Sequence, residues 1–332
     1  MEKIKVGING FGRIGRTLFR NLHGRTDIEV VAINDLADSA TLAHLLKYDS
    51  VHGVFKSIVT SGKNKITVKG QSIRMFEEKD PENVPWGVFK VDVVVECTGH
   101  FLDLEGASKH LKAGAKRVIL SAPPKGKIKT VVLGVNDEII EGDDTVISNA
   151  SCTTNNVAPM IKILDELWGI ESAYITTVHA YTGDQNLHDS PHKDLRRARA
   201  ASVSIIATST GAAKAVTEIF PKLNGKLGGA GIRVPVINGS LTDLTCVLKK
   251  TPTIEQVNKA FREAADFGMK GIIQYTDDPI VSVDVIGNPH SCVFDSQLTS
   301  VLGNMVKVVG WYDNEMGYSA RLVELILRFA RA

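Results

Sequence analysis

Cysteine is scarce in this sequence of 332 residues. It occurs four times, at Cys97, Cys152, Cys246 and Cys292. These spacings match neither a disulfide framework nor the paired cysteines of a zinc site. We therefore expect no disulfides, no metal site and a reducing compartment, which places the protein in the cytoplasm.

An excess of charge and long apolar runs are also missing. Lys and Arg number 39 and Asp and Glu number 37, which gives a formal net charge of +2 and no reason to expect nucleic acid or a membrane as partner. No apolar run is long enough to span a bilayer. We expect no signal peptide, because a strand pattern begins by Ile4 and the glycine-rich turn follows at once. With no internal repeat or low-complexity linker, the length suits two domains with ordinary cores.

A glycine-rich turn follows the first predicted strand. Gly10, Gly12 and Gly15 have the spacing G-x-G-x-x-G and lead into a helical pattern. Such glycines permit a tight turn and let backbone amides approach a pyrophosphate at a helix N-terminus. The next predicted strand, residues 28–33, is followed by Asp35, where a carboxylate binds a ribose and repels a 2′-phosphate. The sequence therefore predicts dinucleotide binding, with NAD preferred to NADP.

Strand and helix patterns continue to alternate after this turn. The apolar runs at 91–95 and 118–120 are typical of strands that are buried on both faces of a parallel sheet. Ligands bind at the carboxyl ends of such strands, which makes residues 98–99 and Ser121 candidate cofactor contacts. Lys79, in a polar loop, either reaches the adenine side of the cofactor or is a solvated surface lysine.

The segment 148–155 contains a candidate nucleophile. A β-rich run precedes it and an amphipathic pattern follows it, so Cys152 is predicted at a strand-to-helix corner with Ser151 as the N-cap. The helix amides and dipole favour an anion there, and can lower a thiol pKa from about 8.5 to about 3.5–7.5. The alternative is a buried structural cysteine.

A candidate base follows the next predicted strand, residues 173–178. His179 ends this strand, so it and Cys152 could meet at one edge of a sheet. A histidine there can hold a thiolate as an ion pair or serve as acid and base. The alternative is a histidine whose hydrogen bonds are merely structural.

Hydroxyl groups and arginines beyond His179 indicate an oxyanion or phosphate site. The polar loop 191–199 contains Arg197, and Thr210 and Gly211 soon open a helical pattern. Arg233 lies within a predicted strand, where an unpaired charge is costly. It is either held in a substrate pocket or buried against a carboxylate.

Taken together, these motifs resemble those of phosphorylating glyceraldehyde-3-phosphate dehydrogenases along essentially the whole chain. The segments that carry the resemblance are 9–15, 148–155, 179–184, 191–199 and 311–318. The resemblance implies an α/β fold with an N-terminal Rossmann-type NAD-binding domain at 1–150. It also implies a mixed α+β catalytic domain at 151–313 and a C-terminal helix at 314–332 that packs on the first domain.

The resemblance also implies roles for individual residues, with Cys152 as nucleophile and His179 as its base. The implied products of D-glyceraldehyde 3-phosphate, NAD and inorganic phosphate are 1,3-bisphosphoglycerate and NADH, and the implied assembly is a homotetramer. The implied NAD contacts are Gly10, Gly12, Arg13, Ile14, Asp35, Lys79, Ser121 and Asn314. The implied contacts to substrate and phosphate are Ser151, Thr153, Thr182, Arg197, Thr210, Gly211 and Arg233.

Three alternatives remain to be weighed against this interpretation. A sister family that oxidises erythrose 4-phosphate uses the same cysteine and histidine, although Thr182 and the pair Thr210 and Gly211 look like those of the glyceraldehyde phosphate enzymes. A cysteine hydrolase would not need the glycine-rich turn or Asp35. A scaffold role gives no reason for a cysteine at a helix start. Asn156 departs from the family pattern, since many relatives have a second cysteine there.

Overall fold

The computed structural model describes residues 2–332, and the chain divides into two compact units. The first unit contains the chain up to Val131 together with Asp137–Ala150 and Ser319–Ala332. The second contains Val132–Asn136 and Ser151–Tyr318. The chain therefore leaves the first unit immediately before Cys152, and its last 14 residues are part of the first unit again.

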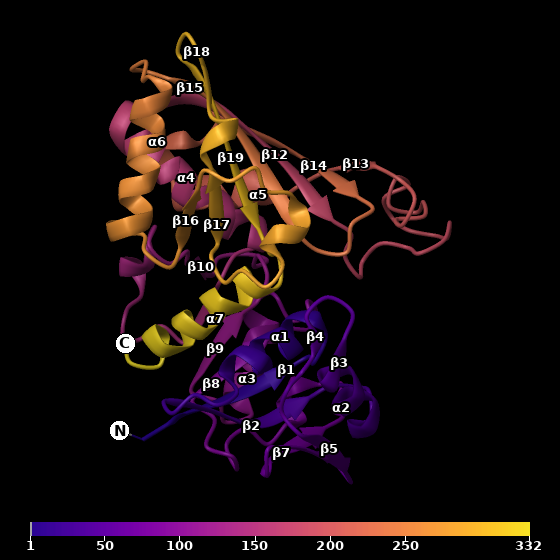
Figure 1. The fold of residues 1–332 in the computed structure, drawn as a ribbon. Coiled ribbons are helices and arrows are strands. Elements are labelled where there is room, and N and C mark those ends of the chain that lie inside the picture. The colour runs from indigo at the N-terminus through magenta and orange to yellow at the C-terminus, as the bar shows by residue number, and fades with distance from the viewer. Residues whose placement is uncertain (1) are drawn as a thin grey trace. The chain divides into compact units, whose positions relative to one another are not determined.

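The first unit is built on a sheet with the strand order β10-β11-β9-β8-β1-β2-β7-β6-β5 (Figure 1). Its strands are β1 (Ile4–Asn9), β2 (Ile28–Asn34), β5 (Val59–Gly62), β6 (Lys65–Val68), β7 (Gln71–Phe76), β8 (Val93–Glu96), β9 (Arg117–Leu120), β10 (Lys129–Thr130) and β11 (Val146–Ser148). Its helices are α1 (Arg13–Leu22), α2 (Ser39–Lys47), α3 (Leu104–Lys112) and most of α7 (Met316–Phe329), and β3 (Tyr48–Asp49) pairs with β4 (Gly53–Val54).

The strand order of this sheet reverses between β1 and β8. From β1 the chain proceeds to β2 and β7 on one side, and then to β8, β9 and β11 on the other, with every pairing in this series parallel. All four residues of β8 are buried, as predicted for its apolar run. The carboxyl ends of β1 and β8 thus form a topological switch point, where open α/β sheets bind ligands.

The second unit is built on a mixed sheet with the strand order β13-β14-β12-β15-β19-β17-β16, and β18 pairs with β19. Its strands are β12 (Ile170–Ala180), β13 (Ile206–Thr208), β14 (Leu227–Val234), β15 (Ser240–Leu248), β16 (Ile273–Thr276), β17 (Cys292–Asp295), β18 (Ser300–Leu302) and β19 (Met305–Tyr312). Its helices are α4 (Cys152–Trp168), α5 (Ala212–Ile219) and α6 (Ile254–Glu263). The expected α+β character of this part is confirmed.

Helix α4 is the core helix of the second unit. Its apolar residues Val157, Met160, Ile161 and Leu164 recur at helical spacing and are fully buried against the sheet. The helix packs on β12, β15, β17 and β19, while α6 lies beside it (Figure 1). This packing holds the first turn of α4 near the end of β12, and so places Cys152 within reach of His179.

Side-chain caps set the starts of several helices. Asp38, Asp103 and Ser151 each accept a hydrogen bond from a backbone amide in the first turn of α2, α3 and α4. Thr253 and Gln256 form a capping box at the start of α6. Across residues 2–332, every helix is too short or too polar to cross a bilayer.

Candidate active site

A sharp corner between β11 and α4 presents Cys152. Strand β11 ends at Ser148, and Ala150 adopts a left-handed backbone with φ 55°. For alanine this conformation costs about 1–2 kcal/mol, and such strain is often found at functional sites. The Ser151 hydroxyl accepts a hydrogen bond from the Thr154 amide at 3.0 Å, which confirms Ser151 as the N-cap of α4. Cys152 is therefore the first residue of the helix.

The Cys152 sulfur faces the His179 imidazole. Sγ lies 3.4 Å from Nε2, and His179 is buried at the penultimate position of β12. On the other side of the ring, Nδ1 lies 2.7 Å from the carbonyl oxygen of Ala180. A nitrogen this close to a carbonyl must carry the hydrogen between them. The neutral imidazole consequently presents the lone pair of Nε2 to the thiol, as a general base requires.

Burial gives this pair a neutral resting state, which corrects the expected low pKa of the Cys152 thiol. Burial raises the pKa of Cys152 and outweighs the opposing effects of the Arg233 charge and the Thr153 backbone amide. Burial together with the Arg233 charge lowers the pKa of His179 to about 3. The directions of both shifts favour a thiol beside a neutral imidazole in the unliganded site at neutral pH.

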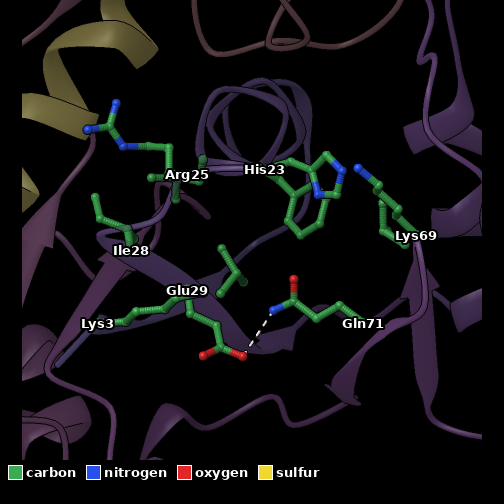
Figure 2. Close-up of a pocket in the computed structure, with 12 residues that line it drawn as sticks. Lys3, His23, Arg25, Ile28, Glu29, Lys69 and Gln71 are labelled. Atoms are coloured by element: carbon green, nitrogen blue, oxygen red, sulfur yellow. Dashed lines mark hydrogen bonds between the residues drawn. The ribbon is translucent and has the colours of Figure 1, made fainter.

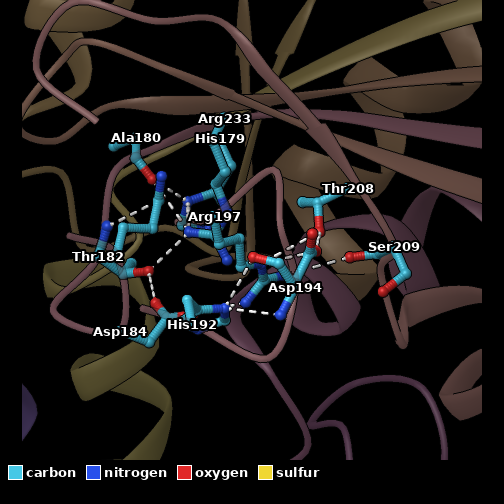
Figure 3. Close-up of polar contacts among 11 residues, drawn as sticks. His179, Ala180, Thr182, Asp184, His192, Asp194, Arg197, Thr208, Ser209 and Arg233 are labelled. Atoms are coloured by element: carbon cyan, nitrogen blue, oxygen red, sulfur yellow. Dashed lines mark hydrogen bonds and ion pairs between the residues drawn. The ribbon is translucent and has the colours of Figure 1, made fainter. Parts of the chain in front are cut away.

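Arg233 extends from β14 towards the same histidine (Figure 3). Its Nη1 donates to the Ala180 carbonyl at 3.0 Å and to the Thr182 hydroxyl at 2.9 Å, and lies 3.0 Å from Nδ1 of His179. Among the described residues its hydrogen-bond partners are neutral, and the Asp184 carboxylate acts on Arg233 through its charge. The predicted role of Arg233 in a substrate pocket stays a prediction. The Nε and Nη2 of Arg233 keep donor capacity for an anion.

Arg197 and Asp184 continue the polar cluster (Figure 3). Nη1 of Arg197 bonds an Asp184 oxygen at 2.5 Å, and Nε donates to the Thr208 hydroxyl at 3.0 Å. Burial by itself raises the pKa of Asp184, but the Thr182 hydroxyl and the charges of Arg233 and Arg197 bring that pKa below its usual value. The structure thus brings Thr182, Arg197 and Arg233 together, with Asp184 as a partner that the sequence did not indicate.

A buried network of hydroxyl groups lies beside the corner that presents Cys152. The Tyr312 hydroxyl lies 2.9 Å from that of Thr153 and 3.0 Å from that of Thr177. Thr153 also contacts the Cys152 sulfur through its amide and hydroxyl, and its predicted contact to substrate or phosphate stays a prediction. The Tyr312 ring meets the His179 ring edge-on, with centroids 6.0 Å apart. Tyr312 lies in segment 311–318, which carries the family resemblance, but the sequence predicted no role for this residue.

The remaining predicted anion contacts lie at the start of α5. Gly211 is the N-cap of this helix, and Thr210 precedes it with its hydroxyl accepting from the Ala212 amide at 3.3 Å. Strand β13 pairs with β14 so that Thr208 lies opposite Gly231 and Ile206 opposite Arg233. The short segment between β13 and α5 therefore joins Thr210 and Gly211 to the same sheet edge as Arg233.

The glycine-rich turn has the shape that a pyrophosphate site needs. Gly10 has φ 92°, and a Cβ there would lie 2.8 Å from the Thr98 amide nitrogen at the end of β8. A Cβ on Gly15 would overlap the carbonyl oxygen of Gly10. A Cβ on Gly12 would enter open space, and among the described residues no side chain caps the start of α1. The residues therefore fit the phosphates of a dinucleotide approaching this helix N-terminus.

Asp35 closes the turn from the end of β2. Its carboxylate accepts from the Phe11 amide at 2.7 Å and from the Ala37 amide at 3.0 Å. Ser121 directly follows β9, at the same carboxyl edge. Lys79 is exposed in the segment after β7, where the Asn34 side chain binds both backbone groups of Glu78. The exposure of Lys79 is compatible with both of its predicted roles.

The other three predicted cofactor residues are placed as follows. Arg13 starts α1 and pairs with Asp49, with Nη2 3.0 Å from Oδ1. Ile14 is partly buried in the same first turn. Asn314 belongs to the second unit, where its side-chain oxygen accepts from the Ser240 hydroxyl at 2.8 Å. Ser240 in turn accepts from the amide of Ala180, next to His179.

Two further features of the first unit lie away from these residues. A pocket of about 200 Å³ opens where β1 and β2 begin, opposite the turn (Figure 2). It contains charges of both signs, with Glu29 bonded to Gln71 at 3.1 Å and Lys69 near His23. Glu141, Asp143 and Asp144 form an acidic group, but the Lys129 ammonium already binds Glu141 and Asp144. Neither feature contains a predicted site residue.

Comparisons with known proteins cover almost the whole chain. Residues 4–104 match the family model described as glyceraldehyde 3-phosphate dehydrogenase, NAD binding domain, and residues 151–314 match the model for the C-terminal domain. A protein of Mycobacterium avium named glyceraldehyde-3-phosphate dehydrogenase is 54% identical over 330 residues, and one of Streptomyces coelicolor with the same name is 56% identical over 326 residues. Each alignment covers 97% of both chains. The chain belongs to the glyceraldehyde-3-phosphate dehydrogenase family.

Proposed function

We propose that this protein oxidises and phosphorylates D-glyceraldehyde 3-phosphate to 1,3-bisphosphoglycerate, using NAD and inorganic phosphate. The observation that carries the proposal is the contact of 3.4 Å between Cys152 Sγ and His179 Nε2, beside the donors of Arg233. A hydrolase could use such a pair, but it would have no use for the NAD-binding domain. The names of the relatives support this substrate over erythrose 4-phosphate.

The first step forms a bond between sulfur and carbon. Cys152 Sγ attacks the aldehyde carbon while Nε2 of His179 takes the thiol proton and passes it to the carbonyl oxygen, giving a hemithioacetal. A neutral imidazole suits this step because the thiol still carries its proton in the resting site. The burial that raises the pKa of Cys152 also makes the thiolate more reactive once the proton has left, because it is poorly hydrated.

The second step oxidises the carbon. Bound NAD supplies the acceptor for the hydride that leaves this carbon. His179 takes the proton of the hemithioacetal hydroxyl, so that a thioester on Cys152 remains. The thioester retains the energy of the oxidation until phosphate attacks its carbonyl carbon, which releases the Cys152 thiolate and an acyl phosphate.

The arginine and hydroxyl cluster binds the anionic groups in this scheme. Arg233 offers Nε and Nη2, and Arg197 is oriented by Asp184 and Thr208. The helix start at Gly211 adds backbone donors. We assign the phosphate group of the substrate and the attacking inorganic phosphate to this cluster, because charge-assisted bonds from arginine favour such oxyanions.

A homotetramer completes the proposal. The segment 185–205 exposes four large apolar side chains, with Leu187 69%, Leu195 82%, Val203 80% and Ile205 74% exposed. Such a concentration in one loop of the second unit is typical of a surface that another chain covers. A second copy of this chain is the proposed partner, within an assembly of four.

The test is an assay of NADH formation by absorbance, with D-glyceraldehyde 3-phosphate and NAD, in the presence and absence of inorganic phosphate. With phosphate we expect continuous turnover. Without it we expect a single burst of about one NADH per active site, since the thioester then accumulates. Erythrose 4-phosphate should react much more slowly, and Cys152→Ser should show no burst. Continuous turnover without phosphate would contradict the acyl phosphate product.

A further inference from the structure

A fully buried carboxylate lies beneath the switch point of the first unit. Glu96 is the last residue of β8, opposite Asn9 of β1, and its exposure is 0%. Burying a carboxylate is costly unless its oxygens are hydrogen-bonded. The neighbours of Glu96 therefore have to supply donors on every side.

Four hydrogen-bond donors occupy the acceptor sites of the two Glu96 oxygens. Oε2 accepts from the Asn9 side-chain amide at 2.5 Å and lies 3.1 Å from Nε2 of His110. Oε1 accepts from the Thr98 amide at 2.6 Å and from the Thr98 hydroxyl. A carboxylate has acceptor sites for all four, whereas a protonated carboxyl or an amide would turn a hydrogen towards one of these donors.

The direction of the hydrogen bond between His110 and Glu96 follows from the Trp86 indole. The Trp86 Nε1–H can only donate, and it lies 3.1 Å from Nδ1 of His110. His110 must therefore accept there, and must carry its hydrogen on Nε2, facing Glu96. Trp86 and His110 are fully buried, so water cannot replace either of them.

The chain of bonds continues from Glu96 into two neighbouring strands. Because the Asn9 amide nitrogen donates to Glu96, its oxygen accepts, and the Asn34 amide donates to it at 2.7 Å. Asn34 then binds the backbone nitrogen and oxygen of Glu78, each at 2.9 Å. The network thus joins the carboxyl ends of β8, β1 and β2 to the segment that contains Lys79.

The glycine-rich turn depends on the position that Glu96 gives to Thr98. A Cβ on Gly10 would lie 2.8 Å from the Thr98 amide nitrogen. The segment that follows β8 therefore forms one wall of the turn. The two hydrogen bonds from Thr98 to Oε1 hold that wall, and the hydrogen bond from Asn9 to Oε2 holds the strand residue that precedes Gly10. Loss of these hydrogen bonds would let the wall and the turn move relative to each other.

We propose that Glu96 is a positioning residue for the cofactor, which holds the ends of β1 and β8 so that the backbone of the glycine-rich turn is preorganised for the dinucleotide. It does so without touching the cofactor. The inference rests on the NAD-binding function of this unit. It predicts that loss of the carboxylate weakens cofactor binding rather than the chemical step, because Cys152 and His179 belong to the second unit.

The test compares Glu96→Gln with a matched control, Asp92→Asn. Asp92 joins the same two strands at their other ends, since it accepts from the Lys5 amide at 2.8 Å and pairs with Lys116. Calorimetric titration of the full-length protein with NAD should give a Kd at least tenfold higher for Glu96→Gln, and a Kd within about twofold of the parent for Asp92→Asn. At saturating NAD the kcat of Glu96→Gln should stay close to that of the parent.

Two further measurements keep the proposal open to refutation. If Glu96→Gln does not fold, His110→Asn removes one of the four donors at a residue that is not a predicted cofactor contact, and should raise the Kd about threefold. Thermal unfolding without NAD should show a larger loss for Glu96→Gln than for Asp92→Asn, because a buried donor loses its acceptor only in the first variant, so both titrations are made well below the unfolding transitions. An unchanged Kd in folded Glu96→Gln, or equal increases in both variants, would overturn the proposal. A parent that binds NAD but forms no NADH would instead contradict the proposed function.

Discussion

Each of the two units places a charged side chain near the carboxyl end of a strand, Glu96 on β8 and Arg233 on β14, and the two charges are satisfied in opposite ways. Four donors surround the carboxylate of Glu96, and both of its oxygens are filled. The contacts of Arg233 among the described residues all use Nη1, and their partners are neutral. A saturated charge holds its neighbours in place, whereas a charge with spare donors can bind an anion from outside.

The difference between Glu96 and Arg233 corresponds to different functions of the two units. Around Glu96 every partner is protein, so the network can only fix geometry. Around Arg233 the protein orients the guanidinium through Thr182 and Ala180, and leaves its other nitrogens for a ligand. Variants of the second unit should therefore alter the chemical steps and the binding of anions. Variants of the first unit should alter the binding of the cofactor.

The largest effect is expected at His179. Replacing it with Asn should lower kcat by about 10²–10⁴-fold, the usual contribution of a positioned acid–base group. The Kd for NAD should not change, because the first unit binds the dinucleotide. Stopped-flow absorbance and calorimetric titration give the two values. A loss of less than about tenfold in kcat would show that another group moves the proton.

Arg233→Gln should have the next largest effect. It removes charge-assisted bonds worth about 1.5–3 kcal/mol, which corresponds to a rise of roughly 10–100-fold in KM for the aldehyde or for phosphate. Arg233→Lys should recover only part of the loss, because a lysine cannot reproduce the planar fork. Arg262→Gln is the control, since Arg262 is an exposed residue of α6 that pairs with Asp277. Equal KM values in the parent and Arg233→Gln would remove Arg233 from the anion site.

Acid should lower the stability of the folded protein, because His179 stays neutral in the folded site. Its pKa is lowered from 6.5 to about 3, so below pH 6.5 the unfolded chain binds a proton that the folded site does not. Stability is therefore lost as the pH falls from 6.5 towards 3, by roughly 2 kcal/mol between pH 7 and pH 5. Urea unfolding at both pH values should show a smaller loss for His179→Asn than for the parent. Identical losses would mean that His179 is protonated in the folded site.

The smallest effect concerns the choice between NAD and NADP. Asp35 should repel a 2′-phosphate. By the family resemblance, Ser190 lies in a loop that approaches the same ribose from a neighbouring subunit, and its hydroxyl would donate one neutral hydrogen bond to the phosphate, worth about 0.5–1.5 kcal/mol. We expect Asp35→Gly to raise kcat/KM for NADP about tenfold, and Ser190→Leu to lower it about threefold. Because Asp35 also accepts from the Phe11 amide, Asp35→Gly should weaken NAD binding as well. A parent that prefers NADP would contradict the argument from Asp35.

Local patterns were sufficient to predict much of this molecule. The turn at Gly10, the strand ends at Ser121, and Ser151 as the cap before Cys152 all depend on short-range rules of backbone geometry and hydrogen bonding. Asn156, where relatives often have a cysteine, shows the limit of such rules. Its amide donates to the carbonyls of Ser291 and Gly310, which lie more than 130 residues away in the sequence.

The sequence by itself determined which residues can do chemistry, and the tertiary structure decided in what state they do it. The order of strands and helices and the types of residue at strand ends predicted the cofactor and the pair Cys152 and His179, and the resemblance of whole motifs predicted the family. The direction of the pKa of Cys152 came out opposite to expectation, because burial depends on everything that packs around the sulfur. The roles of Tyr312, Asp184 and Glu96 also required the fold, since each acts through partners from distant segments that no local pattern brings together.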